Sequence, residues 1–327
     1  MPFRRAAVSV LAVLTVAGCG SGAQAPADTP ADDAALPVVA STNVYGSIVE
    51  AVGGDRVSVE SLIDDPSADP HSYESTPADA AAVAKARLVV VNGGGYDEFL
   101  TQLVESSGTG PAVVEAAALS GLDPAEDGHP EEEHAAGEPG HDGHEHGAFN
   151  EHLWYSLPTV QKVATQIATD LAAADPDGAA RYTANAAAFN QRVAELIGRA
   201  EAIGRAHPGA RVAVTEPVPG YLVEAAGLTD VTPHEFTEAI EEDSDPPIAV
   251  LQETLALFSG QAVRALVVNA QTETPSTDQV REAAQTAGVP VVEMTETLPE
   301  GVTDYTTWMG AQIDALAGAL GAASSGS

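Results

Sequence analysis

The sequence predicts an α/β protein of two lobes, each with a mostly parallel sheet flanked by helices, joined by one long helix. Short apolar runs alternate with stretches of helical periodicity in both halves of the chain, which is the pattern of βα units. Between the halves, residues 158–206 carry apolar side chains at helical spacing and little else. The chain has 327 residues, enough for one large domain or two lobes of ordinary size after removal of an export signal.

The first lobe is expected over residues 37–157. Its strands are short apolar runs at 36–40, 57–63, 88–91 and 112–114. Its helices are expected at 45–52, 77–86 and 96–105. The clearest helix start is Thr76-Pro-Ala-Asp79, because Thr76 can cap the helix, Pro77 suits its first position and Asp79 its third.

The connecting segment, residues 158–206, is expected to hold two helices, at about 157–174 and 179–205. Asp175-Pro-Asp-Gly178 interrupts the periodicity once and separates them. The second helix carries an apolar stripe on one side, formed by Phe189, Val193, Leu196, Ile197 and Ile203.

The second lobe, expected over residues 207–322, repeats the alternation of the first. Its strands are expected at 211–214, 265–269 and 289–294. Its helices are expected at 220–226, 246–260, 277–287 and 304–320.

The amino terminus has the layout of a secretory signal peptide, expected over residues 1–18. Arg4 and Arg5 precede a run of apolar and small residues that is too short to cross a bilayer as a helix. The run ends in Val-Ala-Gly-Cys19, which resembles the site at which bacterial lipoproteins are diacylated. Cys19 is the only cysteine of the chain, and residues 19–36 are rich in Ala, Gly, Pro, Ser and Asp, as in a flexible tether. We therefore expect an extracytoplasmic protein anchored to the cell membrane through a lipidated Cys19; the alternative is a free thiol in a segment that is cut away.

The composition is strongly acidic, with a formal net charge of −35 at pH 7. Such a surface repels nucleic-acid phosphates and anionic lipid head groups, and it raises the local concentration of cations. The composition thus excludes nucleic acid as a partner. We expect a monomer that meets the membrane only through its lipid anchor.

One segment, residues 123–150, has no pattern that could bury a core and is expected to be a loop. It contains five of the nine histidines, His129, His134, His141, His144 and His146. Imidazole is the commonest metal-binding side chain, and clustered histidines favour zinc, copper or nickel. The loop is interpreted as an accessory metal-binding segment, the alternative being an acidic loop with incidental histidines.

Two further histidines lie in loops next to expected strands or helices, where α/β proteins form their ligand sites. His71, in Asp69-Pro-His-Ser-Tyr-Glu74, follows an expected strand, and loops at the carboxyl ends of strands form ligand sites. His152 comes immediately before the connecting helices. Either histidine alone would be a weak indication.

A series of short motifs in one order makes the indication specific. The motifs are Ala40-Ser-Thr-Asn-Val-Tyr45, Asp69-Pro-His-Ser-Tyr-Glu74, Val91-Asn-Gly-Gly-Gly-Tyr96, Asn150-x-His152-x-Trp154, Val214-Thr-Glu216 and the histidine-rich segment. The series resembles that of the zinc- and manganese-binding solute receptors of metal ABC transporters, over about residues 36–320.

The resemblance implies two α/β lobes on one rigid long helix, with the metal ion held in the cleft between them. It also implies delivery of the ion to an ABC transporter permease and its ATPase. Members of the family use two histidines of the first lobe, which match His71 and His152, and two ligands of the second, of which Glu216 matches the first. A departure from the family is Leu157, because members more often have an aspartate before the proline that follows.

The fourth ligand implied by the resemblance is commonly an aspartate after a later strand of the second lobe. This chain has Asn269-Ala-Gln-Thr-Glu-Thr-Pro275 there, without an aspartate. Glu273 is the expected ligand, and Gln271 and a bound water are the alternatives.

The sequence favours Zn²⁺ as the transported ion, with Mn²⁺ as the alternative. Glu216 in place of a histidine makes the ligand set harder and favours manganese, whereas the histidine-rich segment is a feature of zinc receptors in the family. At one fixed site of nitrogen and oxygen donors, zinc also binds more tightly than manganese.

Two other functions are compatible with some of these features. A metallohydrolase would need an open coordination position and a general base, and the chain has no His-Glu-x-x-His motif, so we expect no enzyme. A surface zinc buffer or adhesin without a transport role would share the same fold and site.

Overall fold

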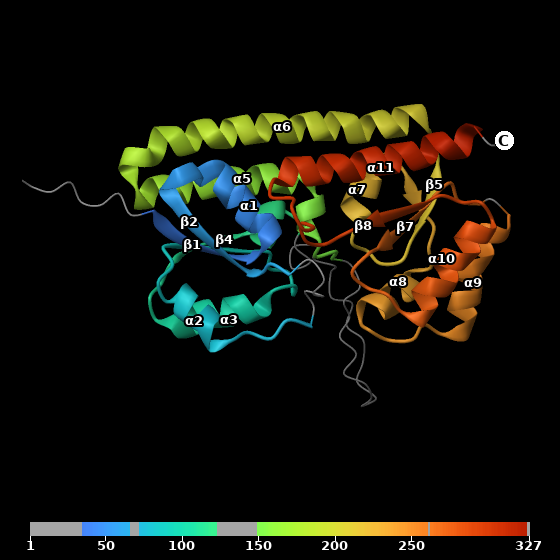
Figure 1. The fold of residues 1–327 in the computed structure, drawn as a ribbon, viewed down its shortest axis with the longest axis horizontal. Helices are drawn as coiled ribbons and strands as arrows, with labels where there is room; N and C mark the ends of the chain where they lie inside the picture. Colours follow the sequence, from blue (N-terminus) through green and yellow to red (C-terminus); the bar gives the residue numbers. More distant parts are fainter. Residues whose placement is uncertain (1–34, 66–71, 123–148, 261, 326–327) are drawn as a thin grey trace, which may run out of the picture. The chain divides into compact units, whose positions relative to one another are not determined.

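The first lobe is built on a parallel sheet with the strand order β2-β1-β3-β4 (Figure 1). This is seen in a computed structural model that describes residues 35–65, 72–122, 149–260 and 262–325. The strands are β1 (Leu36–Thr42), β2 (Val57–Ile63), β3 (Leu88–Val91) and β4 (Ala112–Glu115). Two of the expected strands, 57–63 and 88–91, have the observed bounds.

Helices cover both faces of this sheet. They are α1 (Asn43–Gly53), followed by the 3₁₀ turn η1 (Gly54–Arg56), and α2 (Pro77–Val83), α3 (Glu98–Ser107) and α4 (Ala116–Ser120). The expected start of α2 is confirmed, because the Thr76 hydroxyl accepts from the backbone N–H of Asp79 and the Asp79 carboxylate accepts from that of Thr76 at 2.6 Å. The five-residue helix α4 was not expected from the sequence.

The connecting segment consists of α5 (Leu157–Ala174), the 3₁₀ turn η4 (Pro176–Gly178) and the long helix α6 (Ala179–Ala206). Helix α6 packs along α5 and also contacts α1 of the first lobe and α11 of the second. The apolar stripe faces the core as expected, except that Ile197 is only half-buried. One long helix therefore contacts elements of both lobes.

The second lobe repeats the topology of the first, with the parallel strand order β6-β5-β7-β8. The strands are β5 (Arg211–Val214), β6 (Thr229–Asp230), β7 (Leu266–Asn269) and β8 (Val291–Met294). The helices are α7 (Gly220–Ala225), α8 (His234–Glu241), α9 (Ile248–Ser259), α10 (Pro275–Thr286) and α11 (Tyr305–Ser325). The predicted fold class, two parallel-sheet α/β lobes with a long helix between them, is confirmed.

Two elements of this lobe, β6 and α8, were not expected from the sequence. Strand β6 has two residues and therefore no alternation to read. Helix α8 has eight residues, of which only Phe236, Ala239 and Ile240 are buried hydrophobics, so its periodicity is short. Helix α10 begins at Pro275, earlier than expected, because Thr274 caps it by accepting from the backbone N–H of Thr277.

The lobes share one apolar core and several hydrogen bonds. The largest buried cluster contains residues of both lobes and of α5, α6 and α11. Asn43, at the start of α1, exchanges two hydrogen bonds with the backbone of Leu298, at 2.8 and 3.2 Å. The Tyr155 hydroxyl donates to the Thr295 carbonyl at 2.7 Å. These contacts join the first lobe and the start of α5 to the segment that follows β8.

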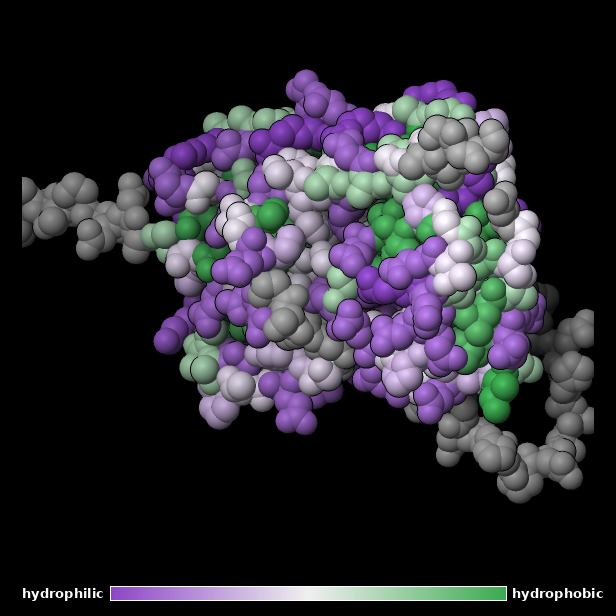
Figure 2. All heavy atoms as spheres, turned by 45° about the vertical axis from the view of Figure 1, so that its right-hand side comes forward, coloured by the Kyte–Doolittle hydropathy of each residue, from purple (hydrophilic) through white to green (hydrophobic). Residues whose placement is uncertain are grey.

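The surface is mainly hydrophilic on the face drawn in Figure 2, with apolar side chains gathered in limited areas. Only three large hydrophobic side chains are more than about a third exposed in the part of the chain that the structure describes, those of Val113, Leu122 and Ile248. Across those same residues, no helix is both long and apolar enough to cross a membrane.

Candidate metal site

His152 is fully buried just before the 3₁₀ turn η3 (Leu153–Tyr155), and its ring is held in one orientation. The Asn150 side-chain oxygen lies 2.8 Å from ring atom Nδ1 and also accepts from the His152 backbone N–H at 3.0 Å. Because Nδ1 faces an acceptor, it carries the ring proton, and in the neutral ring Nε2 keeps the lone pair that can bind a metal. Asn150 thus fixes both the orientation and the protonated nitrogen of the His152 ring.

The same asparagine ties His152 to the second lobe. Asn150 Nδ2 donates to the Pro217 carbonyl at 2.8 Å, and the Tyr221 hydroxyl donates to the Asn150 carbonyl at 2.6 Å. A Cβ at Gly220 would come within 2.7 Å of Asn150 Nδ2, so the absence of a side chain there permits this contact.

Aromatic rings surround His152 on the first-lobe side. The ring centroids of Trp154 and Tyr96 lie 5.2 and 6.0 Å from that of His152. The Tyr96 hydroxyl reaches across to the second lobe and donates to Glu296 Oε2 at 3.2 Å. Burial and the neighbouring charge of Glu296 raise the pKa of Tyr96 well above its usual range, so this hydroxyl remains a donor.

Two buried carboxylates follow the two strands that flank β7 in the second sheet. Glu216 comes two residues after β5 and Glu296 two residues after β8, with exposed fractions of 2% and 1%. Asn269 ends the intervening strand β7, and its Nδ2 donates to Glu216 Oε2 at 2.7 Å and to Glu296 Oε1 at 2.8 Å. One side-chain amide therefore holds both carboxylates at the carboxyl edge of the sheet.

The second ring nitrogen of His152, Nε2, faces carboxylates. Nε2 lies 3.3 Å from Glu241 Oε1 and 3.8 Å from Glu296 Oε2. Glu241 is the last residue of α8, and its side chain is 13% exposed. Ligand atoms of Glu151, His152 and Glu241 lie within 4.8 Å of one another. An imidazole nitrogen among carboxylate oxygens is a donor set for a divalent transition metal.

Glu273, the expected fourth ligand, is not brought to this cluster. Its side chain is 71% exposed and its carboxylate lies 3.9 Å from the Arg281 guanidinium. Glu273 immediately precedes Thr274, the cap of α10, and its carboxylate lies near Arg281 of the same helix. Glu296 lies near His152 instead.

Gln271, the alternative to Glu273, has a supporting position. Its side-chain oxygen accepts from the backbone N–H groups of Glu296 and Thr297, at 2.6 and 3.2 Å. Its Nε2 donates to the Thr297 hydroxyl at 3.0 Å. Gln271 therefore fixes the segment that carries Glu296.

A signal in the sequence could have found Glu296. The strand endings Val214-Thr-Glu216 and Met294-Thr-Glu296 share one pattern, a β-strand followed by Thr and Glu. Glu241 has no comparable signal, because its position depends on how the unexpected helix α8 packs.

Several expected site residues lie outside the described residues. These are His71, Cys19 and the histidines of the accessory segment, His129, His134, His141, His144 and His146. His234, on α8, has a side chain that is 71% exposed and 3.5 Å from Glu238.

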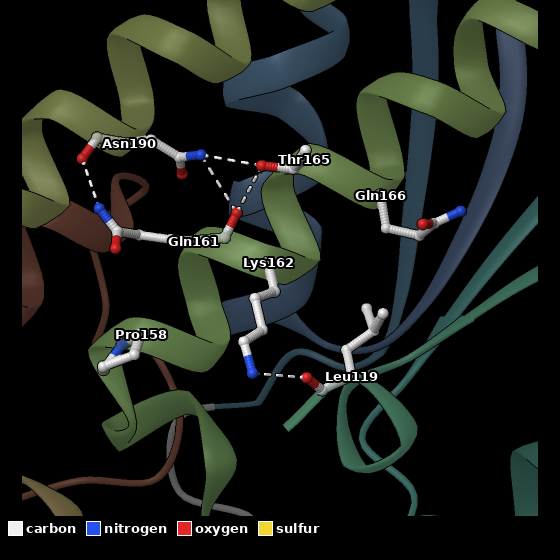
Figure 3. A pocket seen from close by; sticks show the side chains of 7 residues that line it. All are labelled: Leu119, Pro158, Gln161, Lys162, Thr165, Gln166 and Asn190. Carbon is white, nitrogen blue, oxygen red and sulfur yellow. Dashed lines mark hydrogen bonds between the residues drawn. The ribbon is translucent and has the colours of Figure 1, made fainter. Parts of the chain in front are cut away.

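A hollow on the surface of α5 is separate from this cluster (Figure 3). Lys162 in it donates to the carbonyls of Leu119 and Ser120 at the end of α4. Gln161 and Asn190 exchange hydrogen bonds of 2.8 and 3.1 Å between α5 and α6. These polar groups pair the connecting elements with one another.

Comparison with protein families identifies relatives along nearly the whole described chain. The family model described as ZnuA, zinc-uptake complex component A, periplasmic, matches residues 38–319. The manganese-binding lipoprotein MntA of Halalkalibacterium halodurans is 34% identical over 189 residues, which cover 58% of this chain and 55% of that protein. The high-affinity zinc uptake system protein ZnuA of Bacillus subtilis is 28% identical over 73% of this chain and 72% of its own. The chain spans about half the length of the curated relatives it matches first, 55% and 46%.

Solved structures share the fold. A crystal structure of ZnuA superimposes with a TM-score of 0.67 at 22% identity, covering 87% of this chain and 98% of that one. The periplasmic zinc-binding protein TroA from Treponema pallidum gives a TM-score of 0.69 at 18% identity, covering 87% and 99%. At these identities the likeness establishes the fold alone.

Proposed function

The chain belongs to the family of periplasmic zinc-uptake component A proteins, and we propose that it captures a divalent transition metal ion outside the cytoplasm and delivers it to an ABC importer. The observation that carries the proposal is the buried His152 ring, whose Nε2 lies 3.3 and 3.8 Å from two carboxylate oxygens. The family comprises metal-binding transport proteins, not enzymes. The partners are therefore a permease and its ATPase.

The proposed ligands are His71 and His152 with Glu216 and Glu296. His71 follows β2 and Glu216 and Glu296 follow β5 and β8, so each comes after the carboxyl end of a parallel strand, where ligands of α/β proteins bind. Glu296 replaces Glu273 in the set because it lies near His152, whereas Glu273 is exposed beside Arg281.

Manganese is the cargo that the described donors support best. Carboxylate oxygens suit manganese, whereas a zinc-selective site would be richer in imidazole. Among the described residues one imidazole lies near the carboxylates of Glu241 and Glu296, and Asn269 links Glu296 to a further buried carboxylate, that of Glu216, so the donor set is rich in oxygen.

Zinc, the ion favoured by the sequence, is the second candidate. The histidine-rich segment supports it, as does the intrinsic preference of nitrogen and oxygen donors for zinc over manganese. Because zinc binds more tightly at most such sites, affinity alone does not identify the ion that the cell imports.

Metal analysis of the protein purified from its native membrane, followed by titration with Mn²⁺ and Zn²⁺, tests the proposal. We expect one tightly bound ion per chain and a loss of tight binding in His152→Ala. Deletion of residues 127–147 is expected to leave the tight site and remove only weaker binding. Absence of any tight divalent-ion binding would refute the function.

A growth experiment separates transport from storage or adhesion. Deletion of the gene should slow growth when the cargo ion is scarce, and an excess of that ion should restore it. Unchanged growth would favour a metal buffer or an adhesin of the same fold. Labelling with a radioactive fatty acid, lost in Cys19→Ser, tests the lipid anchor and with it the extracytoplasmic location.

A further inference from the structure

Helix α8 brings a third carboxylate of the second lobe to the candidate site. Glu216 and Glu296 follow strands, whereas Glu241 ends a helix that packs on the other apolar cluster of the lobe through Phe236 and Ile240. Resting on the proposed function, we propose that Glu241 is an additional metal ligand and gives the site a preference for ions that favour oxygen donors.

The spacing of the donor atoms fits a shared ion. Two donors that each lie about 2.0–2.2 Å from one metal ion at the tetrahedral angle are about 3.3–3.6 Å apart. His152 Nε2 is 3.3 Å from Glu241 Oε1 and 3.8 Å from Glu296 Oε2. Small movements of these side chains would let both carboxylates and the imidazole bind the same ion.

The chemistry of the closest pair also calls for a cation. Asn150 accepts at Nδ1 of His152, so the neutral ring presents a lone pair at Nε2. A carboxylate oxygen is an acceptor too, and two acceptors approach to 3.3 Å only with positive charge between them, supplied by a ring proton or by a metal ion. The fully buried His152 ring thus directs a nitrogen donor at Glu241.

The end of α8 fixes the position of Glu241. Asp243 has a positive φ of 53°, and its backbone N–H donates to the Ile240 carbonyl at 3.1 Å. The Ser244 N–H donates to the Ala239 carbonyl at 2.8 Å. This pair of bonds is the Schellman motif, and it ends the helix immediately after Glu241. The backbone position from which the Glu241 side chain extends is therefore fixed.

The electrostatics of this helix end favour a bound cation. The carbonyl end of a helix is its negative pole, where carboxylates are unfavourable and cations favourable. Residues 234–245 contain no Lys or Arg, and Glu241, Glu242 and Asp243 are consecutive. A divalent ion bound by Glu241 would offset part of this local repulsion.

The number of donors links Glu241 to the choice of ion. Glu241 adds a second carboxylate beside Glu296 to the donors that lie near His152, whereas tetrahedral zinc is complete with four donors and favours nitrogen among them. Manganese takes more oxygen donors in octahedral geometry, so it gains more from the extra carboxylate. Glu241 should therefore stabilise bound Mn²⁺ more than bound Zn²⁺.

Titration of Glu241→Gln with Mn²⁺ and with Zn²⁺ tests this inference, and Glu242→Gln is the matched control because it removes the same charge from an exposed neighbour. We expect Glu241→Gln to weaken Mn²⁺ binding about 10- to 100-fold and Zn²⁺ binding less than about threefold. Glu242→Gln should leave both affinities within about twofold of wild type. X-ray absorption of the manganese-loaded proteins should show one fewer light donor in Glu241→Gln.

Manganese affinity of Glu241→Gln equal to that of a metal-binding wild type would overturn the inference while leaving the proposed function intact. An equal loss for zinc and manganese would overturn the preference. If wild type bound neither ion, the proposed function itself would fail. Circular dichroism of the variants excludes unfolding as the cause of any loss.

Discussion

The two sheets have the same strand order, and an asparagine stands at the end of the corresponding strands β3 and β7. The two asparagines bind different kinds of group. Asn92 directly follows β3, and its Nδ2 donates at 2.8 Å to the carbonyl of Glu151, the residue before His152. Asn269 ends β7, and its Nδ2 donates to the carboxylates of Glu216 and Glu296. In the first lobe the asparagine thus binds the backbone beside His152, and in the second lobe it binds two charged side chains.

The difference follows from the kind of ligand that each lobe supplies. His152 is neutral when it binds a metal, so fixing the neighbouring backbone and Nδ1 is sufficient to aim it. Glu216 and Glu296 are almost fully buried, and burying carboxylates is costly unless donors or cations face them. The second lobe therefore depends more strongly on its asparagine and on the ion.

The largest effect is expected from removing the imidazole itself. His152→Ala should weaken metal binding by more than about 100-fold, since it removes a donor atom, and losses of supporting residues already cost 10- to 100-fold. His234→Ala is the matched control, because that histidine is exposed on α8. Isothermal titration with both ions checks the difference. Equal affinities of the two variants would contradict the placement of the site at His152.

Asn269→Ala should have the next largest effect and should act on stability as well as on binding. It leaves two buried carboxylates without their shared donor, so the metal-free protein should lose about 2–4 kcal/mol in urea unfolding. Metal affinity should fall about 10- to 100-fold. Asn190→Ala, which removes hydrogen bonds to uncharged groups between α5 and α6, is the control and should leave metal affinity unchanged.

Asn92→Ala should have a smaller effect on binding than Asn269→Ala. It removes hydrogen bonds to neutral partners, the Glu151 carbonyl and the Tyr45 hydroxyl, so the expected loss of stability is about 1–2 kcal/mol. Metal affinity should fall by less than about tenfold. If Asn92→Ala impaired metal binding more than Asn269→Ala, the contrast between the lobes would be reversed.

The same comparison explains what could be predicted from the sequence. The strands were predictable because runs such as Leu88–Val91 are apolar throughout and buried throughout. The long helix α6 was predictable because its apolar residues recur at helical spacing. His152 and Glu216 were identified as candidate ligands through ordered motifs. Glu241 could not be, because its distance from His152 arises from packing of α8, and short helices leave little periodicity. The second-lobe partners of Asn150, and the two carboxylates that Asn269 binds, are distant in sequence, so these contacts appear only in three dimensions.

The smallest effect is expected at helix ends, where the lobes again differ. In the first lobe α3 ends at Gly108, with a φ of 66°, whereas in the second lobe α8 ends before Asp243, with a φ of 53°. Left-handed backbone strains residues that have a Cβ, so Asp243→Gly should stabilise the protein by about 0.5–1 kcal/mol. Gly108→Ala should destabilise it by about 1 kcal/mol, because a Cβ there meets no atom within 4 Å and only the backbone strain counts. Urea unfolding of both variants measures the change in the free energy of unfolding, which should be positive for Asp243→Gly and negative for Gly108→Ala. Stabilisation by Asp243→Gly with unchanged metal affinity would show that Asp243 serves the turn and not the ion, whereas a loss of affinity would show that the strained turn helps to place Glu241.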